Sequence, residues 1–365
     1  MKPKVLIVGR SRYRLPLSPS LQKKFSALEQ ELDVRVLASA APGSPTHDAT
    51  FTLVPLLRPR RLDGLAYWLA LPSRIAKLLR EFRPDAVACQ TAYDALAALI
   101  ARRIARVPAR IVVEVHGDWR TSTRLYGSPA RRALSRVGDA SAAFALRRAD
   151  AVRTVSPFTA SLVRELGVEP AADFPAFMDL DPFVADPPAP LPSQPRVLFV
   201  GVLEAYKNID GLAEAWRLAA PRVPHATLHI VGNGARRDVA EALVRAGARW
   251  DSQLTSAEVA HALDGAWVLV LPSRSEGMGR VLVEAFCRGR GVVGTRAGSI
   301  PNLVSDGVSG LLVDPEDPQA LAAALVRVLS DRTLAERLAA GARDAAAPWL
   351  QTPEQYAERM RELVS

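Results

Sequence analysis

Cysteine is scarce in this chain, which has only Cys89 and Cys287 among its 365 residues. Two cysteines cannot build a disulfide framework or a four-cysteine zinc site, and they fit a reducing compartment. The five histidines show no HExxH-like spacing, so we expect no metal site and no bound cofactor. These shortages exclude the small disulfide-rich and zinc-finger classes and favour a cytoplasmic protein.

Long apolar runs are also missing. No stretch approaches the roughly 18 apolar residues of a membrane span, and residues 1–9 break too early for a secretory signal. We therefore expect a protein that is soluble or attached to the inner face of a membrane. The composition, 49% hydrophobic and 23% charged, is that of a globular chain, and the length predicts two domains.

Positive charge is concentrated in the first half of the chain. Residues 1–190 carry 28 Lys and Arg against 18 Asp and Glu, whereas residues 191–365 carry 19 against 20. The balance is thus +10 in the first half and −1 in the second. Nucleic acid, an anionic membrane and an anionic small molecule are all candidate partners for the basic half. A compositional habit of the source is the alternative interpretation.

A proline-rich segment at residues 186–195 predicts a semi-rigid linker. Short apolar runs alternate with amphipathic segments on both sides, which is typical of βαβ units. We predict an α/β fold of two Rossmann-like, doubly wound parallel-sheet domains facing a cleft. The domains are residues 1–185 and 186–349, and the last helix, within residues 350–365, packs on the first. The predicted strands are Val5–Val8, Val34–Leu37, Ala86–Cys89, Ile111–Val115, Ala151–Thr154, Val197–Val200, Thr227–Val231, Trp267–Leu271, Val292–Val293 and Leu311–Val313. The predicted helices include Leu21–Glu31, Ala95–Arg106, Arg131–Arg147, Phe158–Leu166, Ala235–Ala246, Leu321–Leu329 and Pro353–Leu363.

The strongest motif follows the strand that ends at Leu271. A short loop with two glycines leads into a helix that we expect to begin near Arg280. The glycines let the backbone approach a ligand closely, and the helix N-terminus offers free N–H groups to an anion. Glu276 lies in the loop, and Glu284 lies on the helix eight positions later, about two turns on, among apolar neighbours. We expect Glu284 to bind a ligand; its alternative is a solvated helix face.

Here the sequence resembles the retaining glycosyltransferases of family 4, which have the GT-B fold. Glu276 and Glu284 stand in the Glu-x7-Glu arrangement of that family. Further segments in the second half resemble the family's phosphate loop, its VGxG turn and its GGxPE-type segment, followed by a short strand. They are residues 201–208, 229–234, 298–307 and 310–313. The match is thinner in the first half, at residues 113–118 and 148–156.

The resemblance implies a role for each matched residue. Glu276 would bind hydroxyls of the donor sugar, and Glu284 would bind the ribose hydroxyls. Lys207 would neutralise the leaving diphosphate, and His116 would lie beside the reacting sugar and the acceptor nucleophile. Backbone groups would hold the sugar and the diphosphate, and they belong to Gly277, Met278 and Gly279. For His116, a core histidine bonded to backbone is the alternative.

The implied reaction is retaining hexosyl transfer from a nucleoside-diphosphate sugar to an acceptor hydroxyl, by front-face attack and without a metal. It would serve glycoconjugate, glycolipid or polysaccharide biosynthesis. A fixed cation and oriented N–H groups stabilise the charge that develops on the phosphate. The alternatives are another GT-B nucleotide-sugar enzyme, such as an epimerase, and a basic nucleic-acid-binding protein. We expect no nucleic-acid partner because no zinc-finger or RNP-type motif is present.

Three positions depart from the family pattern. Val202 stands where the family has an arginine that shares the diphosphate, and Arg280 is a candidate replacement as well as a candidate surface residue. Ser299 replaces a glycine, which is tolerable if the backbone φ there is negative. Asn302 replaces a glutamate, which puts an acid role at that position in doubt.

The loop after the first strand keeps one glycine and gains three arginines. Gly9 is followed by Arg10, Arg12 and Arg14, whose side chains point to one side if the segment is extended. They could bind a phosphate-linked acceptor or the donor diphosphate, or they could form a solvated basic loop. We therefore expect an acceptor that is a small molecule or lipid-linked, and anionic if the basic half is functional.

The apolar run at residues 65–71 leads on to Arg74, Lys77 and Arg80, and apolar and basic residues on one segment suit a peripheral contact with an anionic membrane. A core-packed helix is the more common explanation, and we expect Pro72 to interrupt it. Trp119 and Tyr126 could stack on a sugar, but we expect them to pack.

Overall fold

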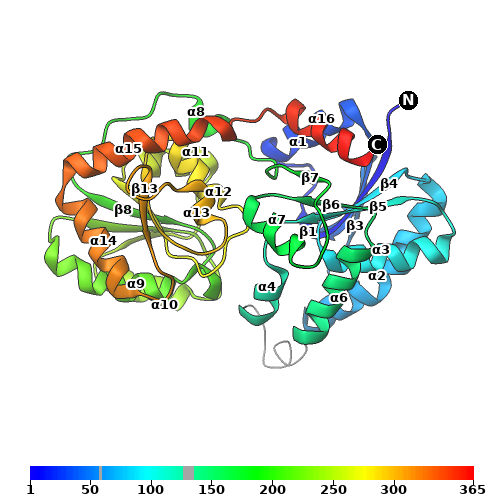
Figure 1. Ribbon diagram of the computed structural model, residues 1–365, viewed down its shortest axis with the longest axis horizontal. Helices are drawn as coiled ribbons and strands as arrows, with labels where there is room; N and C mark the ends of the chain where they lie inside the picture. The colour runs from blue at the N-terminus through cyan, green and yellow to red at the C-terminus, as the bar shows by residue number, and fades with distance from the viewer. Residues whose placement is uncertain (57–59, 126–134) are drawn as a thin grey trace. The chain divides into compact units, whose positions relative to one another are not determined.

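The computed structural model describes residues 1–56, 60–125 and 135–365, and these form two compact units (Figure 1). Unit 1 comprises the described residues of 1–123 and 135–177 together with 351–365. Unit 2 comprises residues 178–350 and residues 124 and 125. Tyr126 and the predicted helical residues 131–134 lie outside the described residues.

Unit 1 is built on a seven-stranded sheet in the order β3-β2-β1-β4-β5-β6-β7, with every neighbouring pair parallel. The central strands are buried apolar runs, as parallel sheets require. Their bounds are β1 Lys4–Tyr13, β2 Asp33–Ala40, β3 Phe51–Val54, β4 Ala86–Cys89, β5 Arg110–Val115, β6 Ala151–Thr154 and β7 Ala172–Asp173.

Helices cover both faces of this sheet because both faces of its strands are apolar. In β1, Val5 and Ile7 join a core with α1 and α16, whereas Leu6 and Val8 join a core with α2, α3 and α6. The C-terminal helix α16 therefore belongs to unit 1 and packs against α1. The helix bounds are α1 Pro19–Glu31, α2 Arg60–Phe82, α3 Ala92–Ala105, α4 Trp119–Leu125, α6 Ser135–Arg148, α7 Pro157–Arg164 and α16 Pro353–Val364.

Helix α2 corrects one expectation. It continues through Pro72 as a single element of 23 residues rather than breaking there. Leu71 and Ile75 are completely buried on either side of the proline. Their burial in the core stabilises a helix that proline alone would destabilise. No helix among the residues the structure describes is long and apolar enough to cross a membrane.

Unit 2 contains a six-stranded parallel sheet in the order β10-β9-β8-β11-β12-β13. Its strands are β8 Arg196–Val200, β9 Thr227–Val231, β10 Arg249–Asp251, β11 Val268–Leu271, β12 Gly291–Thr295 and β13 Gly310–Val313. Its helices are α8 Asp181–Val184, η1 Ala205–Lys207, α9 Ile209–Ala219, η2 Ala220–Arg222, α10 Arg237–Arg245, α11 Ser256–Asp264, α12 Arg280–Cys287, α13 Ile300–Leu303, α14 Pro318–Ser330, α15 Arg332–Ala346 and η3 Ala347–Trp349. Both sheets have the strand order of a doubly wound fold.

The chain passes to unit 2 at residue 178, before the proline-rich segment that begins at residue 186. The reason is the short helix α8, which packs on α11 and α12. The buried side chain of Arg288, at the end of α12, donates to the carbonyls of Phe183, Asp186 and Pro187 at 3.3, 2.6 and 3.2 Å. These bonds fix the linker to unit 2.

Candidate active site

Three loops meet around Glu276, at the carboxyl ends of β8, β11 and β12. The first reaches Lys207 at the end of η1, and Asn208 then starts α9 with φ +53°. The second carries Glu276, and the third carries Gly298 and Ser299. In a doubly wound fold, ligands bind at this end of the strands. The structure therefore places the predicted donor residues where a ligand is expected.

Lys207 and Glu276 form a buried ion pair between Lys207 Nζ and Glu276 Oε1. Each residue is 8% exposed. Ser273 Oγ donates to the same carboxylate oxygen at 3.0 Å. A buried carboxylate needs such partners, because an unpaired buried charge is costly. The arrangement fixes a cation and an acceptor side by side in the loop.

Backbone contacts hold the loops to one another. Arg274 N donates to Tyr206 O at 2.7 Å, and Ser299 N donates to Glu276 O at 2.9 Å. Gly298 has φ +57°, and a Cβ there would lie 2.2 Å from Glu276 O. Only glycine fits such a close approach at a positive φ. The position of Glu276 is thus set by backbone rather than by flexible side chains.

Gly279 is the N-cap residue of α12, and its φ of +69° is in the left-handed region. Gly277 precedes it in the loop, and Met278 is buried. Glu284 lies one turn after Arg280 and is partly buried, so it is not on a fully solvated face. Burial raises the pKa of Glu284, although Arg280 and Lys207 act to lower it. Arg280 itself is exposed.

The turn after β9 backs the Lys207 loop. Gly232 has φ +134°, and a Cβ there would lie 1.9 Å from Gly201 O. Leu203 N donates to Asn233 O at 3.0 Å. Val202, which stands at the family's arginine position, is 47% exposed. The loop thus keeps the backbone that the family resemblance implies without that cation.

Two hydroxyls belong to this site: that of Ser273, which the sequence did not single out, and that of Ser299, which it marked only as a replacement for glycine. Ser273 bonds Glu276, as described above. Ser299 has φ −81°, so its backbone tolerates a side chain, and its Oγ is buried without a hydrogen-bond partner among the described residues. A buried hydroxyl without a partner is uncommon in native proteins and marks a position where a ligand could bind. The only signal in the sequence was the departure from glycine.

His116 follows β5 in unit 1, and its side chain is 42% exposed. This exposure argues against a core histidine. Its Nε2 lies 3.3 Å from Glu114 Oε2. Glu114 also forms an ion pair with Arg153, its direct partner in the register of β5 and β6. Burial acts to raise the pKa of Glu114, but Arg153 and then His116 outweigh it and hold the pKa at about 2.

Arg153 is completely buried and has several further partners. It donates to Phe174 O at 3.1 Å and to Pro175 O at 2.7 Å. Its guanidinium lies 3.9 Å from the centroid of the Phe174 ring and 5.5 Å from that of Tyr356, on α16. The C-terminal helix thus contributes to the surroundings of the carboxylate beside His116.

Arg10 and Arg12, at the end of β1, and Arg14, just after it, do not come together as one anion site. Strand β1 continues to Tyr13, so the segment is extended as expected for residues 10 to 13. Arg10 forms an ion pair with Asp63 of α2 at 3.0 Å, and Arg14 donates to Pro42 O at 3.1 Å. Arg12 is exposed. Protein acceptors therefore already hold two of the three guanidinium groups.

Two further residues singled out from the sequence, Gly9 and Trp119, are both closely packed in unit 1. Gly9 lies within β1, where a Cβ would be 2.1 Å from Gln90 Oε1, so this glycine permits close packing of β1 against the residue that follows β4. Trp119 is 9% exposed and belongs to the core that contains α2 and α3.

The fold and these loops define a class: GT-B glycosyltransferases, with two Rossmann-like domains. Residues 194–331 match the family model described as "Glycosyl transferases group 1", and residues 21–172 match the one described as "Glycosyl transferase 4-like domain". The chain therefore belongs to the GT4-like glycosyltransferase family.

Similar proteins agree with this placement. A D-inositol 3-phosphate glycosyltransferase of Frankia alni is 36% identical over 160 residues, which cover 40% of this chain and 39% of that protein. The matched segment thus spans less than half of that relative. Sucrose-phosphate synthase from Thermosynechococcus elongatus has the same fold, with a TM-score of 0.79, 20% identity and 99% of both chains covered. Anabaena HepE, solved with UDP and glucose, gives a TM-score of 0.71 at 19% identity over 99% of both chains.

Proposed function

We propose that this protein transfers a hexosyl group, with retention of configuration, from a nucleoside-diphosphate sugar to an acceptor hydroxyl. The observation that carries the proposal is the buried Lys207–Glu276 pair beside the N-terminus of α12. A fixed cation and free backbone N–H groups are what a diphosphate leaving group needs. The fold neighbour HepE was solved with UDP and glucose, which supports a nucleotide donor of this kind.

In the proposed reaction, the bond between the anomeric carbon and the diphosphate oxygen breaks, and negative charge collects on the diphosphate. Lys207 and the N–H groups at the start of α12 stabilise that charge without the help of a metal. The acceptor hydroxyl attacks from the face that the diphosphate leaves, and a diphosphate oxygen takes its proton. The products are the glycoside and a nucleoside diphosphate.

The carboxylates have binding roles in this scheme. Glu276 accepts hydrogen bonds from hydroxyls of the donor sugar, and it forms no covalent intermediate. Glu284 binds the ribose, and its raised pKa suits a carboxyl group that interacts with hydroxyls rather than with a cation. His116 of unit 1 contacts the acceptor hydroxyl, with Glu114 holding its Nε2 side.

We further propose that the acceptor is anionic and is presented at an anionic membrane surface. The Frankia relative is named for a phosphorylated acceptor, inositol 3-phosphate. In unit 1, neighbouring helices α2, α3 and α6 carry large apolar side chains that are exposed: Leu69, Ile100, Ile104 and Phe144. Exposed basic residues accompany them, among them Lys77, Arg103 and Arg148. Apolar and basic side chains on one face are typical of peripheral membrane contact.

The direct test incubates the protein with UDP- and GDP-sugars and detects release of nucleoside diphosphate, with and without candidate phosphorylated acceptors. We expect slow donor hydrolysis without acceptor and faster release with the correct one. Thermal stabilisation by the cognate nucleoside diphosphate, ~2.7 kcal/mol at 100 times Kd, would support the donor site independently of the acceptor. If no nucleoside diphosphate stabilises the protein, the proposed donor site is wrong.

A further inference from the structure

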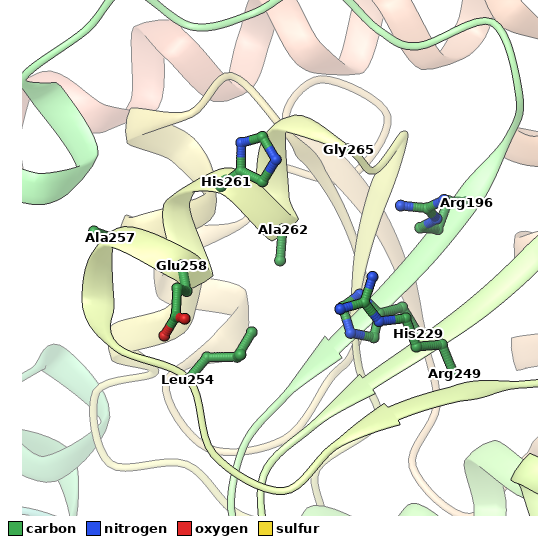
Figure 2. A pocket seen from close by; sticks show the side chains of 9 residues that line it. All are labelled: Arg196, His229, Arg249, Leu254, Ala257, Glu258, His261, Ala262 and Gly265. Carbon is green, nitrogen blue, oxygen red and sulfur yellow. The ribbon is translucent and has the colours of Figure 1, made fainter.

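Unit 2 contains a cavity at the amino ends of its strands, away from the donor loops. Its volume is about 410 Å³, and it lies between the sheet and α11 (Figure 2). Arg196, in the wall of the cavity, is the first residue of β8. Gly201, which begins the loop to Lys207, directly follows Val200, the last residue of β8. At ~3.3 Å per residue, β8 separates the two places by roughly 16 Å. The cavity is therefore not part of the donor site.

The strand register brings three nitrogen-bearing side chains to one face of the sheet. Arg196 pairs with Thr227, and Arg249 pairs with His229. Thr227 and His229 are two residues apart in β9, so their side chains share a face. Figure 2 shows Arg196, His229 and Arg249 on the strand side of the cavity and His261 on α11.

Hydrogen-bonding capacity in this cavity is unused. Arg196 Nε donates to Thr227 Oγ1 at 3.3 Å, and no carboxylate of the described residues lies within ion-pair distance of Arg196. His229 is 3% exposed, and its Nε2 lies 2.7 Å from Asp251 Oδ2. Its Nδ1 has no hydrogen-bond partner among the described residues. A buried polar atom without a partner destabilises the folded state, and a ligand that bonds this atom would offset that loss.

Two carboxylates, Asp251 and Glu258, lie near the two arginines of the cavity wall, and both already have partners. Asp251 is shared by His229 and by Arg249, whose guanidinium lies 2.9 Å away. The Glu258 carboxylate accepts from the backbone N–H of Thr255 at 2.7 Å and from its hydroxyl at 2.8 Å. Burial lowers the pKa of His229, and Arg249 and Arg196 contribute to the lowering against the effect of Asp251. This leaves Arg196 as the arginine of the cavity wall that has no carboxylate partner among the described residues.

We propose that this cavity binds a small molecule through a phosphate group. The free N–H groups of Arg196, with Arg249, donate to phosphate oxygens. With its Nε2 proton donated to Asp251, His229 presents Nδ1 as an acceptor, which suits the P–OH group of a phosphate monoanion. A carboxylate offers no such donor, which is why the site favours phosphate. A cavity of 410 Å³ is larger than a phosphate ion and has room for a small organic group. The proposal does not depend on glycosyl transfer.

The test measures binding of inorganic phosphate and of glycerol 3-phosphate by calorimetry, against chloride of equal ionic strength. We expect Arg196→Gln to weaken binding at least tenfold and Arg249→Gln to weaken it less. The control Arg222→Gln, an exposed arginine outside the cavity lining, should leave binding unchanged. In the wild type, phosphate should shift the ¹⁵N resonance of His229 Nδ1.

Two outcomes would overturn the proposal. The first is equal phosphate binding by the wild type and Arg196→Gln, or no binding by the wild type. The second is loss of binding in Lys207→Ala, because phosphate would then occupy the donor loop instead. Should Arg196→Gln fail to fold, the His229 resonance and Arg249→Gln decide the matter.

Discussion

The two units share a sheet order but carry different chemistry at the carboxyl ends of their strands. In unit 2 the key charges, Lys207 and Glu276, lie in loops that glycine-dependent backbone contacts hold in place. In unit 1 the key charges, Glu114 and Arg153, lie within strands, and a half-exposed histidine stands above them. If unit 2 binds the donor as proposed, its backbone-held charges match a ligand whose own pattern of charge is fixed. In unit 1 the strand-held charges of Glu114 and Arg153 form a rigid support beneath His116, which we propose contacts the acceptor.

The largest expected effect concerns the buried pair of unit 1. Glu114→Ala leaves Arg153 buried without a carboxylate, so we expect the free energy of unfolding to fall by about 3–5 kcal/mol. The matched control is Glu165→Ala, which removes an exposed carboxylate 2.9 Å from Arg120 and should cost less than about 1 kcal/mol. Urea unfolding of both variants makes the measurement. Equal losses would show that burial of the Glu114 pair has no special weight.

The next largest effect concerns the Lys207–Glu276 pair of unit 2 and is measured as a rate of transfer. Lys207→Ala should lower the rate of transfer about 100-fold, or ~2.7 kcal/mol, because the leaving diphosphate loses its fixed cation. Arg217→Ala, an exposed cation on the following helix α9, should leave the rate unchanged. Initial rates with a cognate donor decide the comparison. A loss smaller than about tenfold in Lys207→Ala would mean that the site is misplaced.

Ease of prediction differed between these pairs for a physical reason. In unit 2 the signal for the site is local, because an apolar strand and a glycine-bearing turn lie close in sequence to each of its charged residues, Lys207, Glu276 and Glu284. Glu114 and Arg153 are 39 positions apart, and they meet only because β5 and β6 pair in a particular register. A single sequence does not show that register, so this support for His116 was missed.

The same distinction holds for the fold. The central strands were predicted because each is an apolar run bounded by turn residues. The missed strands β3, β7 and β10 all lie at sheet edges and have two to four residues. In β10 the sequence is Arg-Trp-Asp, which has no apolar run at all. Edge strands pair on one side only and need less burial, so composition marks them weakly.

A third prediction uses the protonation of a buried acid in unit 1. Burial raises the pKa of Asp94 to about 7, even though Thr91 hydrogen bonds and Arg10 lower it. The folded state then binds more protons than the unfolded state between pH 4 and pH 7, so stability falls as pH rises through that range. Asp94→Asn removes this pH dependence. As the pH rises from 5 to 7, the free energy of unfolding of the variant should increase relative to that of the wild type by up to about 1.4 kcal/mol per pH unit. Urea unfolding at pH 5 and pH 7 checks it; parallel changes in both proteins would contradict it.

The smallest effect per residue concerns the surface formed by α2, α3 and α6. Replacing Arg103 and Arg148 by Gln should weaken binding to vesicles containing anionic lipid by about 1 kcal/mol per arginine. The matched control replaces Arg217 and Arg245, two exposed arginines of unit 2, and changes the net charge by the same amount. Sedimentation with anionic and with neutral vesicles separates a placed surface from a general effect of charge. Equal losses in the two double variants would assign the attraction to net charge alone. The excess of basic residues in the first half would then reflect only the composition of the chain. A loss confined to the unit 1 variant would place the membrane contact on the unit proposed to bind the acceptor.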